Sequence, residues 1–246
     1  MSDKIIKDMD DFTVPFMCRS CKARHGGICS VLSPGQLSDL RKHIVKTEQK
    51  RNSVLNVMHD EQGTYSNILS GVVKLSKLMS DGRQQIVGLQ FAPDFLGRPF
   101  SSETDILAEA ATTVHICSFP KNVIEDLIRR NPAVERCLHE QHMKELDEAR
   151  EWMLTLGRKT ALEKVASFVL LIVSHTDPKI AGNKEKIEIG LPLKRAEIAD
   201  YLGLTIETVS RQITNLRKRG IISVNERRSI VVNDKKRLSA IADQCE

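Results

Sequence analysis

The chain has 246 residues and a net charge of +5, with 41% hydrophobic and 28% charged residues, which is ordinary for a globular protein of one or two domains. The N-terminal segment MSDKIIKDMDDF mixes both charge signs, and the longest purely apolar run is Phe168–Val173, so we expect neither a secretory signal nor a membrane span. A cytoplasmic protein is therefore predicted, in which the six cysteines are reduced thiols or metal ligands.

Residues 1–32 are predicted to form an irregular leader with three cysteines in the spacing Cys-x2-Cys-x7-Cys, namely Cys18, Cys21 and Cys29. Gly26 and Gly27 let the backbone fold around a bound centre. A fourth thiolate must come from elsewhere in the chain, and the candidates are Cys117, Cys137 and Cys245. Four thiolates can hold a [4Fe–4S] cluster or a zinc ion, and His25 keeps a Cys3His zinc site open.

Residues 33–130 are predicted to form an antiparallel β domain. A turn at Ser33 begins a short helix at about residues 35–46. From about residue 50 to 120, runs of five to eight residues rich in β-branched side chains alternate with turn signals, and Asp81-Gly82 occupies a hairpin position. Several short strands at this spacing indicate a barrel or jelly roll, and the fold class is therefore α+β.

A long helix is predicted at residues 131–158, after Asn131-Pro132 breaks a preceding short helix. Apolar or small side chains recur along it three or four residues apart, which is typical of one seam of a coiled coil. An amphipathic helix that covers its own domain is the alternative. We favour a homodimer, because a helix of this length overhangs a small barrel. The expected interface residues are Leu138, His142, Leu146, Ala149, Met153 and Leu156.

Residues 159–246 are predicted to form a winged helix-turn-helix, with a tight turn at Gly203 and a helix cap at Thr205. Two short β runs after Gly220 indicate a hairpin wing. The apolar faces of the two helices are expected to comprise Ala196, Ile198, Ala199 and Leu202, then Ile206, Val209, Ile213 and Leu216. From residue 160 onward, 15 Lys and Arg oppose 11 Asp and Glu, a balance of +4 that suits a polyanion such as double-stranded DNA.

The second helix of this motif carries the residues expected to contact DNA. Its N-terminal half would enter the major groove, where Arg211 can donate two hydrogen bonds to guanine and Glu207 can accept one from cytosine. Ser210 can contact a thymine methyl, and Glu207 can orient Arg211 from one turn away. Thr208 and Thr214 lie on the same face. Phosphate contacts are expected from Arg217, Lys218, Arg219, Arg227 and Arg228.

These features resemble those of the CRP/FNR superfamily of bacterial transcription regulators. The similarity spans nearly the whole chain and is carried by LGLTIETVSR at 202–211, GRKTALEKVA at 157–166 and ILSGVVKL at 68–75. It implies an N-terminal β-roll of the cyclic-nucleotide-binding type, a long dimerisation helix and a C-terminal winged helix-turn-helix.

The resemblance also implies roles for individual residues. It implies that Glu207, Ser210 and Arg211 read the TTGAT half-site of a palindrome. It further implies that a hairpin tip contacts RNA polymerase, a solvated turn being the alternative; this tip consists of Asp81, Gly82 and Arg83.

FNR-like members of the superfamily hold a [4Fe–4S] cluster with three leader cysteines and one β-roll cysteine. The resemblance therefore implies oxygen as the signal and four ligands: Cys18, Cys21, Cys29 and Cys117. Seven residues precede the third cysteine instead of the more familiar five, as in an FnrL- or FnrN-like branch. A structural zinc ion, or a response to nitric oxide or redox state, is the alternative.

Three other functions are not expected. The family's cyclic-nucleotide pattern, Gly-Glu followed by Arg-Ser or Arg-Thr, is missing from residues 95–113, where Glu109 would repel a phosphate. His43, His59 and His115 form no haem-ligand pattern. The sequence also lacks a Ser-His-Asp set, a P-loop and a GxGxxG motif, so we do not predict an enzyme.

Overall fold

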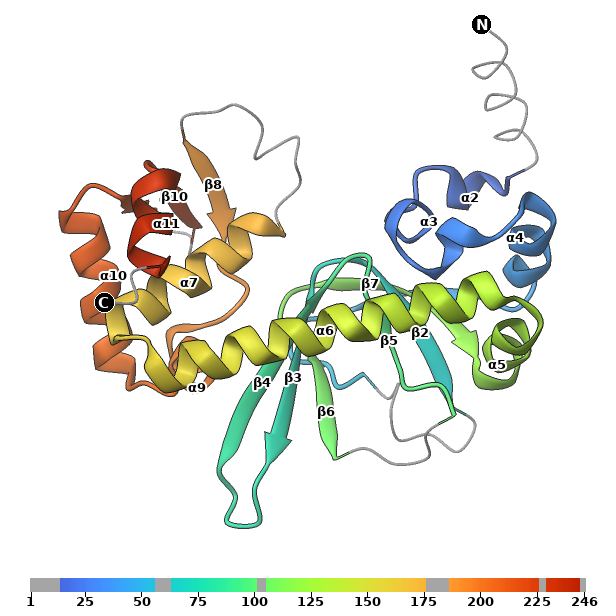
Figure 1. Cartoon of the computed structure of the whole chain (residues 1–246), viewed down its shortest axis with the longest axis horizontal. Coiled ribbons are helices and arrows are strands. Elements are labelled where there is room, and N and C mark those ends of the chain that lie inside the picture. The colour runs from blue at the N-terminus through green and yellow to red at the C-terminus, as the bar shows by residue number, and fades with distance from the viewer. Residues whose placement is uncertain (1–13, 56–62, 101–104, 176–185, 226–228, 244–246) are drawn as a thin grey trace, which may run out of the picture. The chain divides into compact units, whose positions relative to one another are not determined.

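The computed structural model describes residues 14–55, 63–100, 105–175, 186–225 and 229–243. The chain divides into two compact units, unit 1 (Met1–Leu146) and unit 2 (Asp147–Glu246), and their boundary falls within one long helix, α6 (Pro132–Arg158). Unit 1 contains two antiparallel sheets, and unit 2 contains a small sheet among helices (Figure 1). None of the described helices is both long and apolar enough to cross a membrane.

Unit 1 is the predicted antiparallel β-roll. Its first sheet has the order β1-β7-β2-β5, and these strands are β1 (Val45–Gln49), β7 (Val114–Pro120), β2 (Thr64–Ser70) and β5 (Phe95–Leu96). Its second sheet has the order β4-β3-β6, and these strands are β4 (Gln84–Phe91), β3 (Val72–Leu78) and β6 (Ile106–Ala110). The predicted hairpin joins β3 to β4, which pair along their whole length.

The β1-β7-β2-β5 sheet contributes to two cores, because successive side chains of a strand point to opposite faces. Ile68 and Ile116 pack in a core shared with strands of the second sheet. Tyr65, Cys117 and Phe119 face the other way, into a core that the leader and the helices of unit 1 complete. The sheet is therefore covered on both faces. The core between the sheet and the leader contains Cys117, and Cys18 and Cys29 pack against it.

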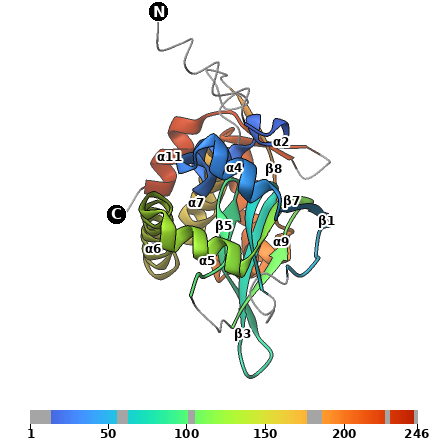
Figure 2. The same ribbon diagram turned by 90° about the vertical axis from the view of Figure 1, so that its right-hand side faces the viewer.

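The described part of the leader consists of short helical turns, not the irregular segment that we predicted. These turns are α2 (Phe16–Arg19), α3 (Lys22–Gly26) and the 3-10 helix η1 (Ile28–Val31). Val14 and Ile28 are buried in the same core as Phe119. Apolar packing against the sheet thus orders a segment with little periodicity of its own. Figure 1 shows α2, α3 and α4 grouped together at the end of the sheet that contains β2 and β7, and Figure 2 shows α4 next to β7.

The helix predicted at residues 35–46 is shorter than expected. It is α4 (Pro34–Arg41), and it begins at a capping box in which Ser33 Oγ accepts from Gln36 N while Ser33 N donates to Gln36 Oε1. The chain from Val45 onward is β1, because it pairs in register with β7. The prediction was wrong here, since pairing with a strand distant in sequence overrode the local pattern.

Two helices complete unit 1. Helix α5 (Lys121–Arg130) buries Ile124 and Ile128 in the core that contains Phe119, and α6 follows it directly. Leu138 of α6 has 4% of its surface exposed and belongs to the same core. Its assignment to the dimer interface was therefore wrong, because the first turns of α6 pack on their own unit.

Unit 2 contains the predicted winged helix-turn-helix, with a sheet ordered β8-β10-β9. Its elements are α7 (Ala161–Ser174), β8 (Ile187–Gly190), α9 (Arg195–Leu202), α10 (Ile206–Lys218), β9 (Ile222–Val224), β10 (Ser229–Val232) and α11 (Lys235–Asp243). Trp152 from the last turns of α6 stacks on Tyr201 of α9 at 4.2 Å between ring centroids. Phe168 of α7 meets Tyr201 nearly edge-on at 6.0 Å. These aromatic contacts fix the end of α6 to the helix-turn-helix.

The turn between α9 and α10 has the predicted chemistry. Gly203 adopts the left-handed conformation with a φ of 61°, and Thr205 Oγ1 accepts from Thr208 N at 3.2 Å to cap α10. The predicted inward face of α10 is buried at Val209, Ile213 and Leu216.

Two of the predicted inward residues are exposed. Ile206 has 47% of its surface exposed, and Ala196 is exposed as well. The prediction was wrong at both positions because each residue lies in the first turn of its helix, beyond the region where α9 and α10 pack together.

Candidate metal centre and nucleic-acid interface

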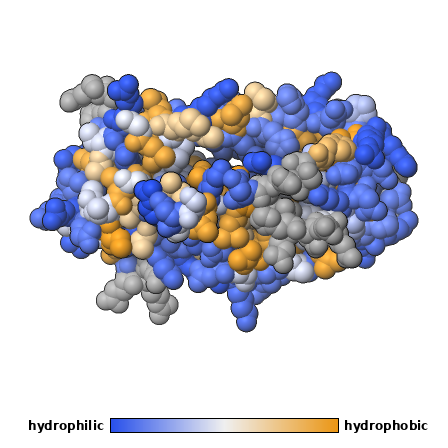
Figure 3. Space-filling model, turned by 90° about the horizontal axis from the view of Figure 1, so that it is seen from below, coloured by the Kyte–Doolittle hydropathy of each residue, from blue (hydrophilic) through white to orange (hydrophobic). Residues whose placement is uncertain are grey.

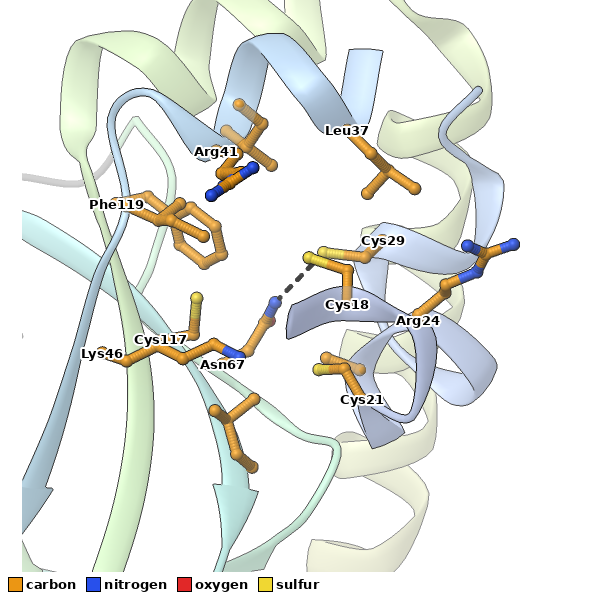
Figure 4. A pocket seen from close by; sticks show the side chains of 14 residues that line it. Cys18, Cys21, Arg24, Cys29, Leu37, Arg41, Lys46, Asn67, Cys117 and Phe119 are labelled. Atoms are coloured by element: carbon orange, nitrogen blue, oxygen red, sulfur yellow. Dashed lines mark hydrogen bonds between the residues drawn. The ribbon is translucent and has the colours of Figure 1, made fainter. Parts of the chain in front are cut away.

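A row of side chains across the first sheet of unit 1 carries the β-roll cysteine. Lys46 of β1, Cys117 of β7 and Asn67 of β2 are paired in register, so they project from the same face of the sheet. Figure 4 shows the leader cysteines across from Cys117, with the Asn67 amide between them. These leader cysteines lie in α2, at the start of α3 and in η1: Cys18, Cys21 and Cys29.

These side chains line one small cavity between the leader and the sheet. Its wall contains all four cysteines that the resemblance implied as ligands, together with Asn67 and three basic residues, Arg24, Arg41 and Lys46. The cavity has a volume of about 20 Å³, which is room for about one water molecule. The Asn67 amide donates a hydrogen bond to Cys29 Sγ at 3.6 Å. The fold thus brings the four thiols to one space.

Burial raises the pKa of three of these thiols. Desolvation raises the pKa of Cys29 and of Cys117 to about 12, and it raises that of Cys18. The Lys46 ammonium acts in the opposite direction on Cys18 and Cys117, as does the Asn67 hydrogen bond on Cys29. These thiols are therefore protonated at neutral pH in the metal-free protein, so a metal that binds them must displace their protons.

The donor set fits a thiolate-bound inorganic centre. All four cysteines are free thiols, and the three cations in the wall would offset the negative charge of bound thiolates. Within the described part of the chain, no three Cys, His, Asp or Glu side chains are placed so that they could hold one metal ion. The thiols surround a common space without converging on a point, so loading requires leader side chains to move.

Gly27 determines how closely the leader approaches the sheet. A Cβ atom at Gly27 would lie 3.0 Å from the carbonyl oxygen of Pro93 and 3.1 Å from that of Ala23. Both contacts are backbone atoms, which cannot swing aside as a side chain can. From the sequence, we expected Gly26 and Gly27 to let the backbone fold around a bound centre. The structure shows a different reason, which is close packing on the turn between β4 and β5.

We expect Gly27→Ala to loosen the leader, because the added methyl group overpacks a backbone contact at a cost of about 1–3 kcal/mol. Limited trypsin digestion of the metal-free protein should then cut at the leader's Arg and Lys residues faster than in the wild type. Gly35→Ala in α4 is the matched control, because a Cβ there meets nothing within 4 Å and the residue is helical. Equal digestion of both variants would contradict this account.

The remaining sulfur and imidazole candidates lie elsewhere. Cys137 of α6 is half-buried and hydrogen-bonds with Ser30, and burial raises its pKa. His25 is exposed, and its Nε2 lies 3.1 Å from the carbonyl oxygen of Arg19, so it does not line the cavity. Cys245 lies outside the described residues.

The predicted DNA-reading residues lie on α10, the second helix of the helix-turn-helix, which is labelled in Figure 1. Glu207, Ser210 and Arg211 are exposed, and Thr214 is half-buried beside them. An open depression on this face is lined by Ser210, Arg211, Thr214, Asn215 and Lys218. Asn215 was not among the predicted contacts, although it lies one turn from Arg211 on the same face.

Two details of α10 differ from expectation. Thr208 is half-buried, and its hydroxyl hydrogen-bonds with Thr205 at 2.9 Å, so this side chain belongs to the helix cap. Glu207 was expected to orient Arg211, but no ion pair or hydrogen bond joins these two described side chains. Their guanidinium and carboxylate groups are therefore both available to a ligand.

The basic residues at the end of α10 are also exposed, namely Arg217, Lys218 and Arg219. Arg219 Nε donates to Asn215 Oδ1 at 2.9 Å, which holds its guanidinium against the helix. Positive charge in a last helical turn also interacts favourably with the helix dipole. The predicted wing residues Arg227 and Arg228 lie outside the described residues.

The hairpin tip between β3 and β4 is ordered by its own charges. Arg83 N donates to Asp81 Oδ1 at 3.0 Å, and the Arg83 guanidinium contacts Asp81 Oδ2 at 2.8 Å. These contacts lower the pKa of the Asp81 carboxyl group. Gly82 completes the turn with a φ of 85°. The tip thus presents a preformed, exposed ion pair.

Most of the predicted dimer-interface residues of α6 are exposed. His142, Leu146, Ala149 and Met153 are exposed, and Leu156 is half-buried. Figure 3 shows hydrophobic groups in orange interrupting a mainly hydrophilic surface. Desolvation lowers the pKa of His142, and the positive charges of Arg98 and His139 lower it further. A neutral imidazole is compatible with an apolar seam.

Serine, histidine and glutamate do meet on the first sheet of unit 1, although no such set was found in the sequence. Ser70 Oγ lies 2.9 Å from His115 Nδ1, and His115 Nε2 lies 3.2 Å from Glu48 Oε2. The His115 and Glu48 side chains are 51% and 57% exposed. Water therefore screens this chain of contacts, and it has the character of a surface ion pair.

A β-roll joined by a long helix to a winged helix-turn-helix, whose second helix exposes Arg, Glu and Ser, defines a DNA-binding transcription regulator. Residues 163–241 match the Crp-like helix-turn-helix domain. The chain is 54% identical over 220 residues to a probable transcriptional activator of Rhizobium leguminosarum bv. viciae. This alignment covers 89% of this chain and 90% of that protein. It is 36% identical over 228 residues to the transcriptional activator protein FnrL of Cereibacter sphaeroides, with 92% of each covered.

Solved structures agree with this assignment. FixK2 from Bradyrhizobium japonicum superposes with a TM-score of 0.72 at 30% identity, over 82% of this chain and 99% of that one. The protein belongs to the CRP/FNR family and is a transcriptional activator of its FNR/FixK group. This family consists of DNA-binding regulators, not enzymes.

Proposed function

We propose that this protein is an oxygen-responsive activator that binds a palindromic TTGAT-type site as a homodimer, with a [4Fe–4S] cluster on Cys18, Cys21, Cys29 and Cys117. The observation that carries the proposal is their common cavity, in which three leader thiols face one thiol of β7. When bound, such a cluster supplies an oxygen-sensitive link between two segments of the chain. As a regulator of the chromosome, the protein acts in the cytoplasm.

The four donors are all thiols, which can hold a [4Fe–4S] cluster or a zinc ion, and the resemblance to FNR-like regulators favours the cluster. Tetrahedral zinc with Zn–S bonds of about 2.3 Å draws its four sulfur atoms to roughly 3.8 Å from one another. The cavity has room for about one water molecule, so either centre requires leader side chains to move when it binds. The basic wall residues Arg24, Arg41 and Lys46 suit the negative charge that four thiolates bring.

The leader is coupled to α6 through the core of unit 1. Val14 and Ile28 of the leader share this core with Val134 of α6. Ser30, next to the ligand Cys29, hydrogen-bonds with Cys137 of α6. A centre that holds the leader on the sheet therefore favours one position of α6. The shift is as large as the preference of that centre for the protein with α6 in this position.

The dimer places two recognition helices on one face of the DNA. The exposed residues Leu146, Ala149 and Met153 of α6 supply the apolar seam, with His142 neutral beside them. Two copies of α10 about 34 Å apart match half-sites one helical turn apart. Arg211, Ser210 and Glu207 then read base edges, while Arg217 and Lys218 contact phosphates.

Two further parts of the β-roll have roles in this proposal. The exposed tip of Asp81, Gly82 and Arg83 contacts RNA polymerase, and its internal ion pair supports this role by presenting a fixed shape. The protein takes no cyclic nucleotide, because residues 95–113 lack the Gly-Glu and Arg-Ser or Arg-Thr pattern that holds the phosphate, and Glu109 at 3.2 Å already neutralises the nearly buried Lys74.

Purification without air tests the proposal directly. We expect a brown protein with about four iron and four sulfide per chain, and DNA binding to a TTGAT palindrome that is lost on exposure to air. A colourless protein with one zinc per chain, whose DNA binding is the same with and without air, would overturn the proposal in favour of a zinc-stabilised regulator. A cluster that responds to nitric oxide but not to oxygen would show that the proposed signal is wrong and that the proposed metal site is right.

A further inference from the structure

Asn67 is a buried polar residue inside the cysteine cavity. None of its surface is exposed, and its side chain lies between Cys117 on the neighbouring strand and the leader cysteines (Figure 4). Its amide nitrogen donates to Cys29 Sγ at 3.6 Å, whereas its amide oxygen is buried without a hydrogen-bond partner among the described residues. A buried amide with only one of its two polar atoms hydrogen-bonded destabilises the fold. Its presence therefore indicates a role other than stability.

The position of Asn67 in the sheet makes its contact directional. It pairs in register with Cys117 on one side and with Phe95 on the other, so the backbone of β2 is held by both neighbours. The adjacent residue, Ser66, points to the opposite face, where its hydroxyl hydrogen-bonds with Ser118 at 2.8 Å. A rigid strand thus presents one N–H group to the third leader thiol.

We propose that Asn67 is a positioning residue of the metal site: its amide N–H holds the Cys29 sulfur and stabilises it as a thiolate ligand, which slows the loss of the centre in air. This inference rests on the proposed function. A hydrogen bond to a ligand sulfur withdraws negative charge from it, and such bonds help to set the stability and potential of iron–sulfur centres. Asn67 therefore adjusts how sensitive the protein is to oxygen.

The test compares full-length Asn67→Leu and Asn67→Asp with the wild type, all purified without air. Leucine keeps about the same volume without a donor, and aspartate keeps the shape but replaces the donor with an acceptor. We expect the visible absorbance of the cluster to decay in air-saturated buffer about 2- to 10-fold faster in Asn67→Leu, the factor that one hydrogen bond represents. Asn67→Asp should decay faster still, because it adds negative charge beside the thiolates.

Ser66→Ala is the matched control, since it removes a buried hydrogen bond from the neighbouring position but from the other face of the sheet. It should lower the thermal stability of the protein and leave the decay rate unchanged. Decay at the wild-type rate in Asn67→Leu, or equal acceleration in Ser66→Ala, would overturn the inference while leaving the cluster itself established.

A measurement without any metal separates this inference from the proposed function. In the metal-free protein, the single variants Asn67→Leu and Cys29→Ala and the double variant form a mutant cycle. We expect a coupling of roughly 2- to 5-fold in the unfolding equilibrium constant measured in urea. Strict additivity would overturn the inference. A coupled cycle in a protein that proves to contain no iron or sulfide would keep the Asn67–Cys29 contact and overturn only the cluster.

Discussion

Cys117→Ser is expected to abolish the inorganic centre and thereby to weaken DNA binding in the absence of air. Among the described residues, Cys117 is the only cavity cysteine that the sheet contributes, so its thiolate would be the link between the leader and β7. A serine hydroxyl stays protonated at neutral pH and is a poor ligand for iron or zinc. We expect iron and sulfide to fall to background, and anaerobic affinity for a TTGAT palindrome to fall by about 10- to 100-fold, the usual size of coupling between two sites.

Cys137→Ser is the matched control for this experiment. Cys137 is a half-buried thiol of the same unit, but it lies outside the cavity and hydrogen-bonds with Ser30. It should retain its iron and its DNA binding, and circular dichroism should show that both variants are folded. A Cys117→Ser protein that keeps a full complement of iron and sulfide would show that β7 is not part of the centre.

Arg211→Ala is expected to cost about 1–3 kcal/mol of binding free energy per recognition helix and to relax specificity at one base pair in each half-site. Its guanidinium is exposed on the N-terminal half of α10 and makes no ion pair with Glu207, so it is free to donate two hydrogen bonds to a guanine. The thermal stability of the protein should not change, because the side chain supports no part of the core. Fluorescence anisotropy with single-base variants of the half-site measures both effects.

Lys218→Ala distinguishes base reading from electrostatic attraction. Lys218 lies in the last turn of α10 and also lines the depression that contains Arg211. Its loss should weaken binding to all sequences alike and reduce the slope of log affinity against log salt by about 1 for each chain. If Arg211→Ala kept the base preference of the wild type, the assignment of Arg211 to base reading would be wrong.

The DNA-binding half of the protein could be read from local sequence because its signals are local. A helix cap at Thr205, a left-handed glycine at Gly203 and the apolar spacing of Val209, Ile213 and Leu216 are each set within a few residues, and each is present in the structure. The errors at Ile206 and Ala196 fall at helix starts, where periodicity cannot say how far a neighbouring helix extends.

The leader and the start of the β-roll could not be read in this way. The strand at Val45–Gln49 forms through pairing with β7, and the leader turns form through burial of Val14 and Ile28, so both depend on residues far away in the sequence. Leu138 fits a coiled-coil seam by spacing alone, yet the fold of unit 1 buries it. The spacing of apolar residues identifies one face of a helix. It does not say which part of the protein, or which partner, packs against that face.

The sequence by itself determined the class of protein, the recognition helix and the cysteine types available for a metal site, because residue identity and spacing define a helix-turn-helix and a set of thiols. Only the tertiary structure decided which thiols meet. Strand register places Cys117 beside Asn67, and close packing at Gly27 brings the leader onto that row. The physical reason is that a cavity exists only where distant segments pack together, so its lining is a property of the fold.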